Sequence, residues 1–279
     1  MSTSSIDVAH DVARRPARAG SRDRSARLPT ASLARLVSPL AVLVLWQLVS
    51  AAGLVSERTV PAPSAIASTG LELLRDGTLL DAIGTSVQRA AAGFLAGAVA
   101  GVGLAVLAGL SRLGEHAVDP LMQMLRALPH FGLIPLFILW FGIGEAPKVA
   151  LVALGVAFPL YLNTFAGIRG VDGKLAEVAR VLRLSRAGLV FHIVLPGALP
   201  QALVGLRQSL GAAWLALIVA EQINASSGLG FMINNAREFL RTDIVVLGLL
   251  VYAALGLLTD SLVRLFERRA LTWRKGFLS

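Results

Sequence analysis

The stretch EVARVLRLSRAGLVFHIVLPGALP, Glu177–Pro200, is charged and lies between long apolar segments. Charged residues recur every three positions here and just before it: Lys174, Glu177, Arg180 and Arg183. Apolar residues recur at spacings of three and four: Leu175, Val178 and Leu182. These spacings predict a helix with one polar and one apolar face. Gly188 is a predicted helix break, and Pro196 and Pro200 suit the first turns of the next helix, where a missing N–H costs little.

Outside this stretch the composition is that of a membrane protein. Hydrophobic residues make up 55% of the chain and charged residues 15%, and the mean hydropathy is +0.70. A soluble domain of this length needs a more polar surface. The net charge of +9 is explained by cytoplasmic loops rich in Lys and Arg, so no nucleic-acid partner is expected. The chain has 0 cysteines, which excludes disulfides.

Apolar runs predict an all-α, polytopic membrane protein with about six transmembrane helices. The third predicted span is interrupted by Pro129 and Pro135, and the fourth contains Pro159, whose freed carbonyls need partners within the bundle. The six spans are Leu33–Gly53, Val87–Leu110, Leu121–Gly142, Val149–Ile168, Ala202–Ala220 and Ile244–Phe266.

The second span carries three small residues four positions apart, Gly93, Gly97 and Gly101. They share one helix face and allow a neighbouring backbone to approach closely. Packing within one subunit is the favoured interpretation, and a seam between two copies is the alternative. Between the spans, short helices are predicted after Ser64, as N-cap, and within Ile223–Asp243.

The distribution of cations predicts the orientation and the domain limits. Residues 1–32 hold a cluster of arginines and no apolar core of a signal peptide, so we expect a disordered basic cytoplasmic tail. Residues 33–270 form the predicted transmembrane domain, with a cytoplasmic loop at about 169–200, and residues 271–279 a second cytoplasmic tail. With both termini inside, most Lys and Arg residues lie on the cytoplasmic side, as the positive-inside rule requires.

The amphipathic pattern alone leaves two interpretations of the charged stretch. It suits a helix that lies on lipid headgroups. It also suits a helix that projects from the membrane and docks into a cleft of a soluble partner.

The stretch resembles the cytoplasmic "EAA" loop of permease subunits of ATP-binding-cassette (ABC) importers. That pattern is Glu-Ala-Ala, three residues, Gly, nine residues and Ile-x-Leu-Pro. Glu177, Val178 and Ala179 match its start, and Ile193, Leu195 and Pro196 match its end. Arg183 stands where the family has the glycine that turns the chain. Because an arginine with positive φ is strained by about 1 kcal/mol or more, the loop is expected either to continue as helix or to turn elsewhere.

Other segments in the same order resemble the nitrate, taurine and aliphatic sulfonate branch of this family, and closest the aliphatic sulfonate permeases. Among them are RALPHFGLIPLFILWFGIGEAPK and LPGALPQALVGLRQSLGAAWLALIVAE. The resemblance implies the type I ABC importer permease fold in a bacterial inner membrane. It implies a homodimer, a separate ABC ATPase and a periplasmic or extracellular solute-binding protein. The chain itself is expected to use no cofactor, because it contains no phosphate-binding loop and ATP belongs to the partner.

The resemblance also assigns a coupling role to residues of the loop: Glu177, Val178, Ala179, Arg180, Arg183, Ser185, Ile193, Leu195 and Pro196. Polar residues near span ends are candidates for a substrate pathway, since polar groups at membrane depth often mark one: Arg126, Asn163, Arg207, Gln208 and Glu221. An anionic substrate favours arginine donors. The alternative for Arg126 and Arg207 is that their side chains have no pathway role and snorkel toward the lipid headgroups. No catalytic residues and no metal-ligand spacing are found.

Two other classes of membrane protein fit the sequence less well. An intramembrane protease would need a nucleophile motif with a histidine partner, or paired aspartates, and neither occurs. An ion-coupled carrier would place carboxylates in mid-span, whereas here they cluster at span ends, with Asp260 nearest to an exception. Within the sulfonate branch, taurine, nitrate or another small solute remains the alternative substrate.

Overall fold

The computed structural model describes residues 30–56 and 58–272, and every regular element in that part of the chain is a helix. The chain forms two units, divided between Leu45 and Trp46. Helix α1 (Thr30–Ala51) begins in the first unit and contains the apolar stretch Val37–Ala51. The tails predicted for residues 1–32 and 271–279 lie almost entirely outside the described residues.

Among the described residues, 4 helices are long and apolar enough to cross a membrane. They correspond to the second, fourth, fifth and sixth predicted spans. Each is long enough because a helix rises about 1.5 Å per residue and the bilayer core is about 30 Å thick. They are α3 (Thr78–Leu110), α6 (Ala146–Arg169), the run Arg186–Ile223, which includes all but the last residue of α9 (Leu195–Asn224), and α11 (Thr242–Ala270).

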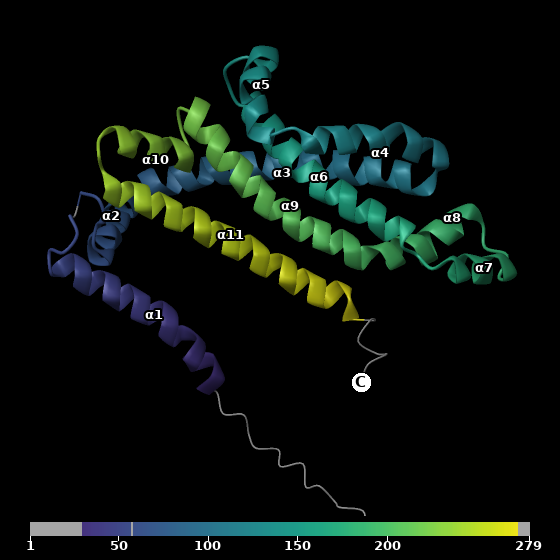
Figure 1. The fold of residues 1–279 in the computed structure, drawn as a ribbon, viewed down its shortest axis with the longest axis horizontal. Coiled ribbons are helices and arrows are strands. Elements are labelled where there is room, and N and C mark those ends of the chain that lie inside the picture. Colours follow the sequence, from purple (N-terminus) through teal and green to yellow (C-terminus); the bar gives the residue numbers. More distant parts are fainter. Residues whose placement is uncertain (1–29, 57, 273–279) are drawn as a thin grey trace, which may run out of the picture. The chain divides into compact units, whose positions relative to one another are not determined.

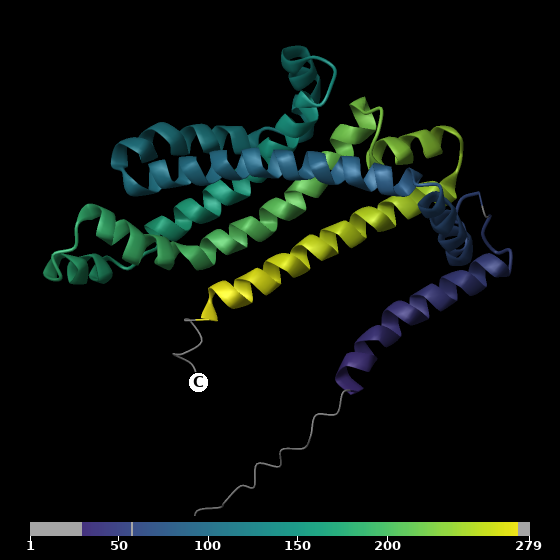
Figure 2. The same ribbon diagram turned by 180° about the vertical axis from the view of Figure 1, so that it is seen from behind.

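In the second unit α6 lies between α3 and α9, and α11 flanks α9 on its other side (Figure 1 and Figure 2). At one end of this bundle lie the short helices α2 (Pro63–Arg75) and α10 (Leu229–Glu238). At the opposite end lie α7 (Gly173–Val181) and α8 (Arg186–Leu189), together with the turn that follows α3. These are called the α10 end and the α7 end below.

The predicted third span is divided in the structure. Helix α4 (Arg112–Ala127) starts at the α7 end and runs beside α3, and η1 (His130–Leu133) and α5 (Ile134–Phe141) follow. Leu128 has extended backbone, φ −76° and ψ 137°, as expected for a residue before proline. The break at Pro129 is therefore confirmed. Pro135 interrupts no helix: it occupies the first turn of α5, where it needs no N–H partner.

Glycines of α3 and α9 bring both backbones against α6. A Cβ atom added at Gly97 would lie 2.3 Å from the Ala153 carbonyl oxygen, and one added at Gly101 would lie 2.5 Å from that of Ala157. On the other face, a Cβ at Gly205 of α9 would lie 3.0 Å from the Pro159 carbonyl oxygen. The prediction that the glycine stripe packs within one subunit is confirmed.

Pro159 lies inside α6, and side chains of the bundle bond to carbonyls beside it. Ser209 Oγ of α9, which is fully buried, donates to the Val156 carbonyl at 2.9 Å. Asn163 Nδ2 donates to the Pro159 carbonyl at 2.8 Å. Helix α6 continues through the proline. The carbonyl that Pro159 frees is that of Gly155, four residues before it, and a bundle partner for that carbonyl stays a prediction.

The predicted break at Gly188 is wrong. The helical path continues from Arg186 through the π turn Val190–Val194 into α9, and Leu195 N–H bonds to the Val190 carbonyl. Proline clashes with the carbonyl four residues before it, and a π turn widens the helix at that place. Pro196 lies in the first turn of α9 as predicted, whereas Pro200 lies inside α9.

Both short helices predicted between spans are present, as α2 and α10. The cap predicted for the first of them is wrong: Ala62 is the N-cap of α2 and Pro63 begins the helix. The Ser64 N–H instead bonds to Gln47 Oε1 at 3.1 Å.

Candidate functional site

The α7–α8 segment exposes apolar side chains at the α7 end. Val181 is 82% exposed, Leu182 65% and Val178 51%. Leu175 and Leu184 are exposed beside them. Exposed apolar side chains grouped in this way are typical of a surface that binds a partner. The polar face carries Glu177, which is exposed as well.

The chain turns between α7 and α8 at Arg183, the position of the family glycine. Arg183 has φ 52°, in the left-handed region. The Leu184 N–H bonds to the Ala179 carbonyl at 3.0 Å, which is the long hydrogen bond of a Schellman helix end. The turn is therefore made where the family makes it, and the expectation that the helix continues or turns elsewhere is wrong.

The other residues assigned to coupling lie along this segment. Ala179 is buried, and Ser185 caps α8 by accepting from the Gly188 N–H at 3.0 Å. The side chain of Arg180 lies outside the described part of the structure. Half-buried side chains lead from the loop into α9: Ile193, Leu195 and Pro196.

Three of the five predicted pathway residues gather around one hollow. Gln208 Oε1 of α9 accepts from Asn163 Nδ2 of α6 at 3.0 Å, and Asn163 Oδ1 accepts from Gln201 Nε2 at 2.9 Å. Gln208 and Arg126 line a cavity of about 510 Å³, together with Pro129, Pro159 and Leu215 among others. This site combines one cation and amide donors with apolar walls, as small-molecule sites do.

Arg207 lies at a second hollow, between α9 and α11. Its Nε donates to Asp260 Oδ1 at 2.6 Å, and Arg264 Nη2 lies 3.0 Å from Asp260 Oδ2. The cavity measures about 580 Å³, and Gln208 lines it too. Arg207 is thus paired with a carboxylate, and Gln208 borders both hollows.

Glu221 lies apart from the other predicted pathway residues. Its side chain is fully buried, and it accepts from Arg89 Nη1 at 2.7 Å, from Tyr252 Oη at 2.8 Å and from the Gly230 N–H at 2.8 Å. Ser86 Oγ donates to it as well. A carboxylate with this many donors is well compensated for burial. We propose a structural role for Glu221 in joining α3, α9, α10 and α11.

Arg89 is the centre of this cluster, and the sequence analysis did not assign it a role. Its Nε and Nη2 donate to the two carboxylate oxygens of Glu145 at 2.5 Å and 2.8 Å, and its Nη1 donates to the Ser227 carbonyl at 2.6 Å. The sequence did contain a signal for this role: Arg89 is a charged residue within the Gly- and Ala-rich α3, and a buried cation needs a carboxylate partner. Which carboxylate it meets depends on how the helices pack.

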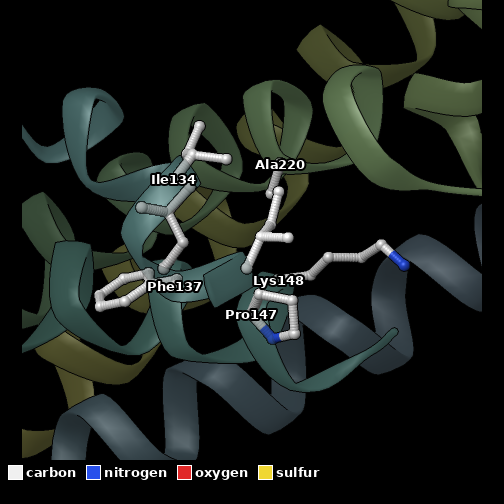
Figure 3. A pocket seen from close by; sticks show the side chains of 7 residues that line it. Ile134, Phe137, Pro147, Lys148 and Ala220 are labelled. Atoms are coloured by element: carbon white, nitrogen blue, oxygen red, sulfur yellow. The ribbon is translucent and has the colours of Figure 1, made fainter. Parts of the chain in front are cut away.

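Lys148 joins the same cluster from α6. Its stem helps to line a small apolar pocket with Ile134, Phe137, Pro147 and Ala220, and its amine points away from these side chains (Figure 3). The amine donates to Glu145 Oε1 at 3.0 Å. The Arg89 hydrogen bonds are the main cause that lowers the pKa of the Glu145 carboxyl to about 2, and burial opposes them.

No group of His, Asp and Glu side chains that could hold a metal ion occurs among the described residues. The candidate functional site has three parts: the exposed α7–α8 surface, the two polar hollows, and the Arg89 cluster toward the α10 end.

Comparison with known families decides what this arrangement is. Residues 93–272 match the family described as "Binding-protein-dependent transport system inner membrane component". The chain belongs to this family. It is therefore a transport subunit of an inner membrane and not an enzyme, which removes the protease and other enzyme interpretations.

Curated relatives match over most of their length. The chain is 48% identical over 242 residues, 87% of its length and 88% of the relative, to a putative aliphatic sulfonates transport permease protein SsuC of Bacillus subtilis. It is 47% identical to the protein of the same name from Escherichia coli, over 86% of this chain and 91% of that one. The identity to the taurine transport system permease protein TauC of Escherichia coli is 34%, over 85% of this chain and 88% of that one.

Solved structures support the same fold. An amino acid ABC transporter aligns with a TM-score of 0.60 at 18% identity, over 71% of this chain and 97% of that chain. The MetNI methionine ABC transporter in inward-facing conformations aligns with a TM-score of 0.55 at 17% identity, over 67% of this chain and 95% of that chain. The predicted fold, an all-α ABC importer permease of type I, is confirmed.

Proposed function

We propose that the chain is the permease subunit of an ABC importer that moves a small aliphatic sulfonate across the bacterial inner membrane. The observation that supports this choice of substrate is the sequence identity of 48% and 47% to two permeases named for aliphatic sulfonates. The sequence identity to a taurine permease is lower, 34%, which favours an aliphatic sulfonate over taurine as the substrate. The hollow beside Arg126 and Gln208 suits a small anion with a short apolar tail.

The α7–α8 segment is the surface that docks the ATPase subunit. Its exposed apolar face would lie in a cleft of that partner, and Glu177 and Arg183 would lie at the rim. The membrane-surface interpretation of this segment is less favoured, because the segment projects at the α7 end (Figure 1). The ATP that drives transport is bound and hydrolysed on the partner, so this chain needs no cofactor.

The α7 end is cytoplasmic in this proposal, and the α10 end faces the solute-binding protein. The apolar part of α1 supplies one further crossing, and α4 together with α5 supplies another, which gives about six crossings and places both termini inside. Two copies of the chain form the pathway, and the exposed apolar faces of the long helices meet the second copy or lipid.

Growth and uptake experiments test the substrate. A strain lacking this gene should lose growth on ethanesulfonate as the sole sulfur source, and the full chain supplied in trans should restore it. Growth on taurine, or on nitrate as the sole nitrogen source, should be unchanged. Loss of growth on taurine or nitrate with normal growth on ethanesulfonate would assign another substrate of the branch.

The Glu177→Lys variant tests the coupling surface. Reversing the charge at the rim of the docking cleft should abolish uptake while the chain still inserts and the ATPase retains its basal hydrolysis. Glu238→Lys, an exposed site on α10 at the opposite end, is the control for charge reversal and should leave co-purification of the ATPase unchanged. Normal uptake by Glu177→Lys would contradict the assignment of this surface.

A further inference from the structure

The Glu145 carboxylate is exposed, but the two cations that hold it are buried. The Glu145 side chain is 58% exposed, whereas Arg89 is 5% exposed and Lys148 4%. Arg89 donates to both carboxylate oxygens, and Lys148 donates to one of them. A bidentate pair of this kind presents the edge of a guanidinium to a planar pair of oxygens. That edge and the lysine amine form a recess for an anion.

The rest of the cluster is held by contacts that do not involve Glu145. The remaining nitrogen of Arg89 bonds to Glu221 and to the Ser227 carbonyl. Glu221 is held in turn by Ser86, Tyr252 and the Gly230 N–H. Arg89, Lys148, Glu145 and Glu221 together carry no net charge. Withdrawal of Glu145 therefore leaves one uncompensated positive charge and a free guanidinium edge.

Glu145 is the N-cap of α6, and an exposed turn leads into it. Gly142 has φ 76°, and Ile143 is 84% exposed. Beside the segment is a hollow of about 360 Å³, lined by Thr85, Gln88, Arg89, Glu145 and Ser227, among others. This volume is several times the roughly 30 Å³ that one water molecule occupies in the liquid. A small anion fits next to the guanidinium edge.

We propose that Arg89 and Lys148 form an anion site in which Glu145 is a tethered occupant, and that a free monovalent oxyanion of the sulfonate class displaces it. A sulfonate offers oxygens at the spacing of a carboxylate and restores the charge balance. Displacement releases the Glu145 side chain from Arg89 of α3 and so loosens the turn Gly142–Gly144 before it. The choice of sulfonate rests on the proposed function, whereas the anion site rests on the geometry alone.

A single-cysteine probe reports displacement, since the chain has 0 cysteines of its own. Ile143→Cys carries a spin label in the full chain in lipid nanodiscs. Ethanesulfonate should increase the mobility of the label at constant ionic strength, and the neutral diethyl sulfone should not. An unchanged spectrum, or an equal response to the neutral compound, would overturn the proposal.

Binding to variants gives an independent measurement. Glu145→Gln removes the carboxylate charge that competes for the site. In the native chain the site is free of Glu145 in only a minor fraction of molecules, whereas in the variant it is free in most of them. Ethanesulfonate should therefore bind to the variant at least about tenfold more tightly, as measured by calorimetry. Lys148→Gln should weaken binding. Glu115→Gln is the matched control, since Glu115 forms a salt bridge with Arg169 at the α7 end. Binding to Glu145→Gln that is no tighter than to the native chain would contradict displacement.

The two proposals fail separately. If nitrate moves the label and binds more tightly to Glu145→Gln while ethanesulfonate does neither, the anion site stands and the sulfonate assignment fails. If cells take up ethanesulfonate but neither anion gives either response, the transport function stands and the anion site is refuted.

Discussion

At the scale of single residues, two non-glycine residues among those described adopt positive φ, Arg183 at 52° and Leu240 at 56°. Each follows a helix that ends with a long hydrogen bond, from the Leu184 N–H to Ala179 and from the Arg241 N–H to Ala236. Glycine is the usual residue at such an end because it has no Cβ. Both side chains are exposed, so neither gains burial that offsets the strain.

Replacement of Arg183 by glycine should therefore stabilise the purified chain. Relief of left-handed strain, roughly 1–2 kcal/mol, exceeds the loss from a more flexible unfolded chain, about 0.5–1 kcal/mol. The melting temperature in detergent measures the net gain. Arg183→Ala is the control, because it removes the same charge but keeps the Cβ. A gain from alanine equal to that from glycine would show that strain is not the cause.

The Glu145 carboxylate predicts a pH dependence. Its pKa is lowered to about 2 from an ordinary value of 4.5, so its contribution to stability is present above about pH 5 and is lost as the pH falls from 4.5 toward 2. The difference in melting temperature between the native chain and Glu145→Gln should be constant from pH 5 to 8 and shrink below that range. A difference that changes between pH 6 and 8 would contradict this account.

At the scale of elements, the contact between α3 and α6 depends on the absence of side chains. The glycines of α3 touch the backbone of α6, and Gly103 on the same helix has open space around its Cα. Helices in a membrane associate through close packing of this kind, because lipid offers no hydrophobic force between them.

Gly97→Ala should therefore destabilise the chain by about 1–3 kcal/mol, since its Cβ would press into the Ala153 carbonyl. Gly103→Ala is the matched control and should be neutral or stabilising, because alanine is the better helix former by about 1 kcal/mol. Thermal unfolding in detergent compares the two. Equal effects would mean that the glycine stripe has no packing role.

The sequence predicted the long helices because their signal is local, an apolar run of sufficient length. It also predicted the helix end at Pro129, where the restriction on Leu128 is local too. The π turn before Pro196 could not be predicted, because it is a choice between two ways of avoiding one steric clash. The pairing of Arg89 with Glu145 could not be predicted either, since it depends on packing between residues far apart in the chain.

At the scale of the whole molecule, the proposed orientation places Val181 and Leu240 on opposite sides of the membrane. Both are 82% exposed, so single cysteines at these positions differ in side and not in accessibility. In intact spheroplasts an impermeant maleimide should label Leu240→Cys, and should label Val181→Cys only after lysis. Labelling of Val181→Cys before lysis would invert the topology and refute the docking of a cytoplasmic ATPase.

Helix α6 connects the two ends of this arrangement. It runs for 24 residues, about 36 Å at 1.5 Å per residue, from the residue after Glu145 to the residue that pairs with Glu115. Glycine contacts on both flanks keep it from sliding independently of its neighbours. In the proposed orientation, a displacement that the ATPase produces at the α7 end would therefore be transmitted along α6 to the end that faces the solute-binding protein.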